Sequence, residues 1–144
     1  MAYWIKILYD RDIYAIDLDA IGVFCFSSNR KINFWLPDGG LLICIHPQSN
    51  PDAYQQVFDY VQKIYANRAK LAHWIKFNYE RAEYVLDLNR ITAFSQETKS
   101  GRISFWLPDS GTKIILHPQS NFEVYSQVIQ YIEQKTGYCM KENH

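Results

Sequence analysis

The sequence reads Phe34-Trp35-Leu36-Pro37-Asp38, and 71 residues later it reads Phe105-Trp106-Leu107-Pro108-Asp109. A second pentapeptide, His46-Pro47-Gln48-Ser49-Asn50, recurs as His117-Pro118-Gln119-Ser120-Asn121. Outward from these stretches the two halves of the 144-residue chain align, with an offset of 70 residues that becomes 71 near Ser100. About 28 of about 64 aligned positions are identical. Chance does not produce such agreement, so the sequence predicts a tandem duplication of one structural unit.

Each copy shows the same series of predicted strands followed by one helix. In the first copy the hydrophobic pattern predicts strands at 3–9, 13–18, 21–26, 32–36 and 41–46, with a tight Pro-Asp-Gly-Gly turn at 37–40. Ser49 or Asn50 can cap a helix whose apolar residues recur every three or four positions. The same capping signal recurs at 120–121, and Gly137 is expected to end the second helix.

The sequence therefore predicts an α+β protein with two copies, at residues 1–68 and 69–137, and a polar tail at 138–144. Each copy is expected to be an antiparallel five-strand meander followed by a C-terminal helix. The segment between the copies, 66–71, is short and lacks Pro and Gly, which favours close docking as a pseudo-dimer. This strand order closed by a helix is similar to that of pleckstrin-homology-like domains, a resemblance that bears on fold and not on function.

Alternation along the strands sorts the side chains onto two faces of each sheet. One face is apolar and is expected to form the core beneath the helix. In the first copy it comprises Ile5, Ile7, Tyr9, Tyr14, Ile16, Leu18, Ile21, Val23, Ile32, Phe34, Leu36, Ile43 and Ile45. The opposite face carries Trp4, Lys6, Asp17, Phe24, Trp35 and His46, which recur as Trp74, Lys76, Asp87, Phe94, Trp106 and His117. Its aromatic residues need cover, supplied either by the other copy or a homodimer, or by a partner in an aromatic-lined groove.

The two copies differ in polarity on this second face. Four apolar residues of the first copy align with polar residues of the second: Leu8 with Asn78, Ile13 with Glu83, Phe26 with Gln96, and Leu42 with Lys113. Random drift does not favour four changes in one direction on one face. We therefore expect the outer face of the first copy to be more deeply covered than that of the second, by an oligomer interface or a protein partner.

Composition argues against several classes of partner. Lys+Arg and Asp+Glu both number 15, so the formal net charge is zero, and the basic residues do not cluster. Nucleic acid is therefore not an expected partner, since its binding depends on grouped positive charge. No apolar run approaches the roughly 18 to 20 residues that span a bilayer, and the N-terminus lacks a signal-peptide pattern. No membrane partner and a cytoplasmic location are predicted.

The motifs do not indicate catalysis. His46 and His117 each stand three residues before a serine, but no G-x-S-x-G sequence provides a nucleophile elbow. The three cysteines form no CxxC pair, and the His and acidic residues lack metal-ligand spacing. Cys25 and Cys44 are expected to be small buried hydrophobes, with Cys139 in the polar tail. We predict no enzymatic activity, no metal and no cofactor.

The sequence thus predicts a non-catalytic binding or protein-interaction module that uses the outer aromatic face, with a protein partner or self-association. The candidate binding residues are Trp4, Leu8, Ile13, Phe24, Phe26, Trp35, Leu42, His46, Trp74, Trp106 and His117. The alternative is a small-molecule pocket, with or without enzymatic activity, between the two copies at the Trp/His face.

Overall fold

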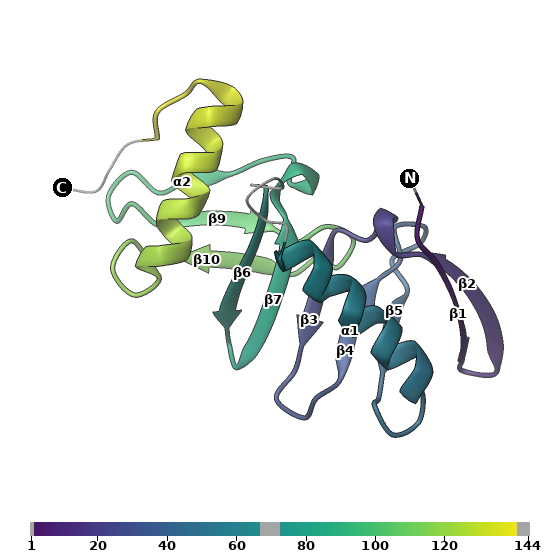
Figure 1. Ribbon diagram of the computed structural model, residues 1–144. Coiled ribbons are helices and arrows are strands. Elements are labelled where there is room, and N and C mark those ends of the chain that lie inside the picture. The colour runs from purple at the N-terminus through teal and green to yellow at the C-terminus, as the bar shows by residue number, and fades with distance from the viewer. Residues whose placement is uncertain (1, 67–72, 141–144) are drawn as a thin grey trace.

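The computed structural model describes residues 2–66 and 73–140 and has an α+β fold with antiparallel sheets (Figure 1). The N-terminal half contains β1 (Trp4–Tyr9), β2 (Asp12–Asp17), the 3-10 turn η1 (Leu18–Ala20), β3 (Val23–Phe26), β4 (Ile32–Trp35), β5 (Leu42–Ile45) and α1 (Pro51–Ala66). The C-terminal half contains β6 (Trp74–Tyr79), β7 (Ala82–Asp87), η2 (Leu88–Arg90), β8 (Ser95–Gln96), β9 (Ile103–Trp106), β10 (Lys113–Leu116) and α2 (Phe122–Thr136). The predicted boundary at 68 and 69 lies outside the described residues.

The strands form three sheets, one of which combines the two halves. This five-stranded sheet has the order β5-β4-β3-β7-β6, while β1 and β2 form a separate hairpin and β10-β9-β8 a three-stranded sheet (Figure 1). The predicted five-strand meander within each copy is therefore wrong, because among the described strands β3 pairs with β4 and with β7 of the other half, and not with β2. The sheets do not confirm the similarity to the pleckstrin-homology-like strand order.

A 3-10 turn connects β2 to β3, in place of the two-residue turn that the predicted strands implied. The Asp17 carboxylate caps η1, accepting hydrogen bonds from the N–H groups of Asp19 (3.0 Å) and Tyr3 (2.9 Å). Leu18 is fully buried and anchors the turn in the core. Asp87 caps η2 in the same way. The turn carries the chain away from the hairpin, so β3 is free to pair with β7.

The β3–β7 joint is buried on both faces of the sheet. Val23 lies opposite Leu86 and Phe24 lies opposite Val85. Val23 and Leu86 belong to the core of the C-terminal half, whereas Phe24 and Val85 belong to that of the N-terminal half. The alternation had placed Val23 in the core of its own copy and Phe24 on the outer face, and the structure reverses both. A strand covered on both faces carries apolar residues at every position, so parity does not identify its inner face.

Contacts of Gly22 and Arg90 add to the packing between the two halves at the β3–β7 joint. A Cβ atom on Gly22 would lie 2.9 Å from Cγ of both Arg90 and Pro108, so only glycine fits there without a shift. The Arg90 guanidinium donates hydrogen bonds to the carbonyl oxygens of Ala20 (2.8 Å) and Asp19 (3.1 Å). Arg90 of the second half thereby holds the η1 turn of the first half in place through these two hydrogen bonds.

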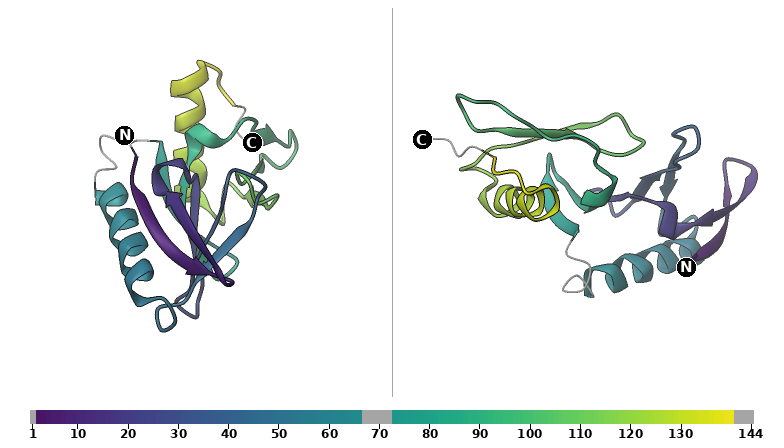
Figure 2. Two further views of the ribbon diagram at one scale, coloured as in Figure 1. Left: turned by 90° about the vertical axis from the view of Figure 1, so that its right-hand side faces the viewer. Right: turned by 90° about the horizontal axis from the view of Figure 1, so that it is seen from above.

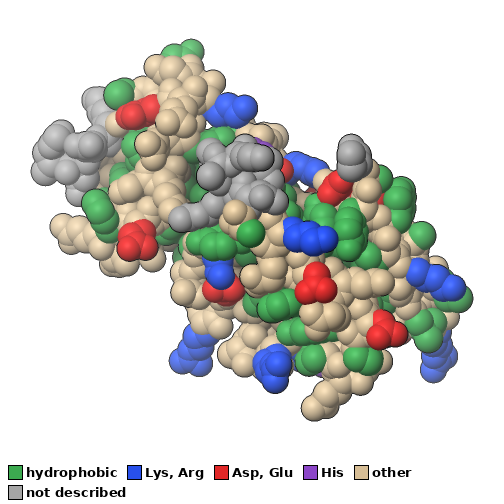
Figure 3. Space-filling model, in the orientation of Figure 1, with side chains coloured by type: hydrophobic (Ala, Val, Ile, Leu, Met, Phe, Trp, Pro, Cys, Tyr) green, Lys and Arg blue, Asp and Glu red, His purple; other side chains and the backbone are tan. Residues whose placement is uncertain are grey.

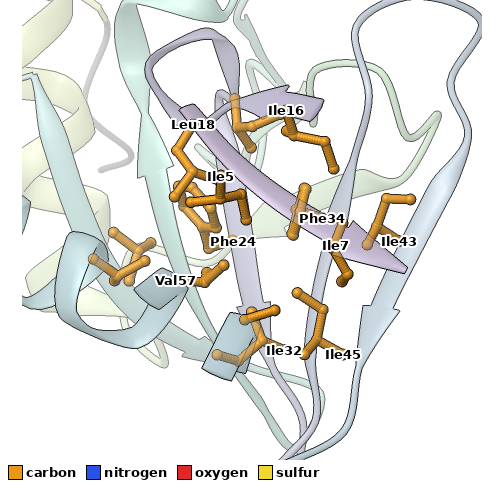
Figure 4. Close-up of a cluster of buried hydrophobic side chains, with 14 of the residues drawn as sticks. Ile5, Ile7, Ile16, Leu18, Phe24, Ile32, Phe34, Ile43, Ile45 and Val57 are labelled. Atoms are coloured by element: carbon orange, nitrogen blue, oxygen red, sulfur yellow. The ribbon is translucent and has the colours of Figure 1, made fainter. Parts of the chain in front are cut away.

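Each half has its own hydrophobic core. In the first, side chains of β1 and β2 meet those of β3, β4, β5 and α1 (Figure 4). Its most deeply buried members include Leu18, Phe24, Ile32, Phe34, Ile43, Ile45 and Val57. In the second core the β6–β7 hairpin, β9, β10 and α2 contribute the equivalent residues. Two residues of the second half, Trp74 and Val85, also enter the first core.

The molecule is elongated. The β1–β2 hairpin lies at one end, and the sheet β10-β9-β8 with α2 lies at the other, in the view of Figure 1 and when seen from above (Figure 2). Gly137 ends α2 as predicted, with a left-handed φ of 77°. The predicted side-chain cap of α2 is not formed, because Asn121 Oδ1 accepts instead from the N–H of His117 (3.0 Å). Neither helix, within the described ranges, has the length and apolarity that crossing a membrane requires.

Candidate interaction surface

The β1–β2 hairpin presents the candidate surface. Asp10 and Arg11 turn the chain between the strands with positive φ angles of 50° and 73°, as a type I′ hairpin turn requires. One face of the hairpin, with Ile5, Ile7 and Ile16, packs into the first core (Figure 4). We call the opposite face the outer hairpin face, which comprises Trp4, Lys6, Leu8, Ile13 and Ala15.

The outer hairpin face is apolar and exposed. Trp4, Leu8 and Ile13 expose 64%, 60% and 68% of their surfaces, and Leu8 lies directly opposite Ile13 in the strand register. Along the same hairpin, no strand within the described part of the chain pairs with the outer edge of β2. Tryptophan beside an unpaired strand edge is characteristic of surfaces that bind another protein chain.

The matching face of the β6–β7 hairpin is covered by the first half. Trp74, which aligns with Trp4, is only 9% exposed, and its ring stacks on Phe24 with centroids 6.5 Å apart. Lys76 Nζ lies 4.7 Å from the centroid of the Tyr65 ring on α1. The expectation that the two copies cover each other's aromatic residues therefore holds for Trp74 and not for Trp4.

Two of the predicted binding residues lie in the core instead. Phe24 is fully buried, and the Phe26 ring packs edge-on against Phe58 of α1 at 6.4 Å between centroids. Both follow from the reversed inner face of β3. Trp35 is half-buried against the core of the second half. These three aromatic side chains contribute to packing and not to the outer hairpin face.

The remaining candidates are exposed but belong to other sheets. Leu42 on β5 is 41% exposed, and Trp106 on β9 is 58% exposed, with Lys113 Nζ 5.8 Å from its ring centroid. His46 and His117 are exposed at the ends of β5 and β10. The structure therefore does not gather the predicted Trp and His residues onto one face.

Three of the four apolar residues specific to the first half are not covered by the described residues. Leu8, Ile13 and Leu42 all exceed 40% exposure, whereas Phe26 is half-buried against α1. On the side of the molecule shown in Figure 3, apolar side chains reach the surface among charged groups of both signs. The polarity difference between the two halves thus corresponds to exposed side chains at Leu8, Ile13 and Leu42, and to a half-buried side chain at Phe26.

A recess of about 450 Å³ lies between the two halves. Its lining comprises Tyr3, Asp19, Tyr60, Lys63, Ile64, His73, Trp74 and Asp87. His73 Nδ1 lies 2.6 Å from Asp87 Oδ1. Burial, and then the hydrogen bond to Asp19, raise the pKa of Tyr60 above its ordinary value. The sequence pattern did not single out His73, because its counterpart in the first copy is Tyr3 and the repeat therefore carries no signal for it.

The cysteines and acidic groups form no further site. Cys25 is buried and Cys44 half-buried, and neither forms a disulfide. Burial raises the pKa of the Cys25 thiol, and burial together with that thiol raises the pKa of Tyr84 to about 12. Within residues 2–66 and 73–140, no three His, Cys, Asp or Glu side chains are grouped to hold a metal ion. No protein-family model, curated protein or solved structure matches the chain.

Proposed function

We propose that the protein is a non-catalytic protein-binding module whose partner docks on the outer hairpin face. The observation that supports this function is the contrast between Trp4, 64% exposed, and Trp74, 9% exposed, in the same local sequence. A large apolar side chain that is covered at one position and bare at the other marks a surface suited to a partner. Trp4 would be the anchor, since buried tryptophans often dominate binding energy.

The mode of binding is strand addition. The outer edge of β2 offers backbone N–H and C=O groups that a partner strand can pair with, while Leu8 and Ile13 supply apolar contact.

The proposed origin of the two halves is tandem duplication, supported by the matching caps of η1 and η2. The absence of a disulfide at Cys25 and Cys44 fits a reducing compartment such as the cytoplasm.

Site-specific photo-crosslinking inside the cells that express the protein tests the proposed function. A benzophenone amino acid at Ile13 is expected to give covalent adducts with protein, and the same probe at the matching residue Glu83 is the control. Addition of Leu8→Glu should remove the adducts at Ile13, because it places a charge on the apolar contact. Absence of adducts at Ile13, or adducts that Leu8→Glu leaves unchanged, would refute the binding role of this face.

The second candidate function is a small-molecule site in the recess between the halves. It is supported by the paired His73 and Asp87 beside Trp74, in a volume large enough for a small ligand. The lining residues include no serine or cysteine, which favours binding over acyl transfer. A fragment screen by NMR would support this site if binding shifts the Trp74 indole signal and His73→Ala abolishes the shift; shifts confined to other residues would exclude it.

A further inference from the structure

The β3–β7 joint shows how the β6–β7 hairpin of the second half packs against the first half. In it the Phe24 ring contacts Phe34 (5.7 Å between centroids) and Tyr60 (6.0 Å), and Trp74 of the arriving hairpin stacks on Phe24. Val85 of the hairpin is 1% exposed beside Phe24. The intrachain joint thus combines three features: an aromatic cluster around Phe24, an edge of β3 available for strand pairing, and a Trp on the hairpin that packs against them.

The second half carries the same receiving surface without a hairpin on it. Phe94 aligns with Phe24, and its ring contacts Phe105 (5.5 Å between centroids) and Tyr131 (6.2 Å) as Phe24 contacts Phe34 and Tyr60. No described strand pairs with the free edge of β8. Ala93 is exposed, whereas its counterpart Val23 is 1% exposed in β3, opposite Leu86 of β7. This receiving surface comprises Ala93, Phe94, Phe105, Tyr131 and the free edge of β8.

The first half carries the matching hairpin, β1–β2, which we call the insert. The free edge of β2, with exposed Ala15, corresponds to the edge of β7, with buried Val85. On the neighbouring strands, exposed Trp4 of β1 corresponds to buried Trp74 of β6. The receiving surface and the insert are therefore the two sides of one interface, and no described strand of this chain pairs with either side.

Residue sizes across the unoccupied interface are complementary. At the intrachain joint Gly22 leaves room for Arg90, and a Cβ there would collide with the Arg90 side chain. At the equivalent positions Thr92 takes the place of Gly22, and Ala20 takes the place of Arg90. The larger residue on one side thus accompanies the smaller residue on the other. A second pair of positions, at the strand ends, also differs between the two contacts. In the intrachain joint the apolar Phe26 lies opposite the polar Glu83, and in the proposed contact the polar Gln96 would lie opposite the apolar Ile13.

The chain does not close this interface on itself. The β1–β2 hairpin and the sheet that contains β8 lie at opposite ends of the molecule (Figures 1 and 2). An insert at one end and a receiving surface at the other form a heterologous, head-to-tail contact between copies, which generates a ring or an open filament.

On these grounds, and resting on the proposed function, we propose that the partner of the outer hairpin face is a second copy of this chain. The edge of β2 in one copy pairs with residues 93–96 of the next, which include β8, with Ile16 opposite Ala93, Ala15 opposite Phe94 and Ile13 opposite Gln96, the register of the β3–β7 ladder. Trp4 then stacks on Phe94. The intermolecular contact lacks the Arg90 hydrogen bonds of the intrachain joint and is the weaker of the two.

Analytical ultracentrifugation of the purified full chain tests the proposal with two substitutions at exposed alanines. The wild-type mass should rise above 17.0 kDa over about a hundredfold increase in concentration. Ala15→Glu blocks the insert and Ala93→Glu blocks the receiving surface, so each should weaken self-association by more than about tenfold. The control Asn78→Glu, exposed outside both surfaces, should behave as wild type.

Mixing the two blocked variants identifies a head-to-tail contact. Each keeps one intact surface, so an equimolar mixture should form a one-to-one dimer that neither variant forms alone. A face-to-face contact between two outer hairpin faces would instead be insensitive to Ala93→Glu, and the proposal would be wrong. In the wild type, hydrogen exchange at the β2 edge should slow as concentration rises, and in Ala93→Glu it should not. This second readout applies even where Ala15→Glu fails to fold.

The failures of the two proposals are distinguishable. A wild-type chain that remains at 17.0 kDa throughout overturns self-association. If the probe at Ile13 nevertheless gives adducts with a different protein that Leu8→Glu removes, the binding function stands with another partner. If neither self-association nor adducts occur, both proposals fail.

Discussion

The β1–β2 and β6–β7 hairpins share their turn geometry, their caps and the Trp that begins the first strand, but only one of them is covered on both faces. Trp74 and Val85 are buried by the first half, while Trp4 and Ala15 face solvent. Local sequence thus fixes the hairpin and its inner face. What lies against the outer face depends on whether another segment of chain reaches it. The following substitutions test this comparison, beginning with the largest expected effect.

Substitution of the two aligned tryptophans should separate the hairpins most clearly. Trp74→Ala is expected to lower the free energy of unfolding by about 3–5 kcal/mol, because it empties a packed site beside Phe24. Trp4→Ala should change it by less than about 0.5 kcal/mol in dilute solution, where its surface is exposed. Urea denaturation of both variants measures the difference. Equal losses would show that the outer hairpin face is covered within the single chain.

The next effect concerns the joint between the halves. Gly22→Ala is expected to destabilise the fold by about 1–3 kcal/mol, because the new methyl group meets Arg90 and Pro108 at 2.9 Å. At the aligned but exposed position, Thr92→Ala should cost less than about 0.5 kcal/mol. In a chain that already carries Arg90→Ala, Gly22→Ala should cost less than it does in the wild type but more than zero, since the Pro108 ring remains. Thermal unfolding is a suitable readout, and a cost of zero in that chain would contradict the packing described.

A smaller difference is expected between the two capping carboxylates. Asp87 is 7% exposed and bonds both His73 and the N–H of Asn89, whereas Asp17 is half-buried. Asp87→Ala should cost about 1–3 kcal/mol, because it removes a buried carboxylate that bonds both the His73 ring and the Asn89 N–H. Asp17→Ala should cost about 1 kcal/mol, the usual effect of losing a cap. Denaturant midpoints compare the two; the reverse order would mean that the recess side of Asp87 is open to water.

The smallest expected effect lies in the loops that precede β4 and β9. Hydrogen bonds from Ser100 and then Arg102 hold the pKa of Glu97 below its ordinary value, and the first half has Ser27 at this position. A lowered folded-state pKa means that the contribution of Glu97 is present above its unfolded pKa and is lost as the pH falls through the folded value. The Gly101 amide signal should therefore titrate below the usual glutamate range by NMR. Glu97→Gln should abolish that titration, and a titration that persists would assign it to another group.

Much of the local structure could be predicted from the sequence. The hairpin strands, the helices and the glycine that ends α2 follow from alternation, spacing and capping residues. The pairing of β3 with β7 could not be predicted, because alternation defines the faces of a strand and not its neighbour. Phe24 was misplaced for a related reason: β3 is apolar on both faces, so the pattern that separates inside from outside is absent there.

The candidate site was predicted in part. Trp4, Leu8 and Ile13 lie together on one exposed face, and Leu8 and Ile13 are two of the four positions at which the copies differ in polarity. Phe26 shared that polarity difference but points into the core, and the histidines lie on other sheets. His73 was missed altogether, because only the tertiary fold places it beside the recess formed with Tyr60 of α1.

The sequence by itself determined the repeated order of elements and the side of each hairpin that enters a core, since both depend on periodicity within a few residues. Only the tertiary structure decided that the second hairpin joins the sheet of the first half and that the first hairpin pairs with no other described strand. The physical reason is that burial is a relation between distant segments. Identical tryptophans, each the first residue of its strand, therefore differ in exposure because only Trp74 has the other half of the chain against it.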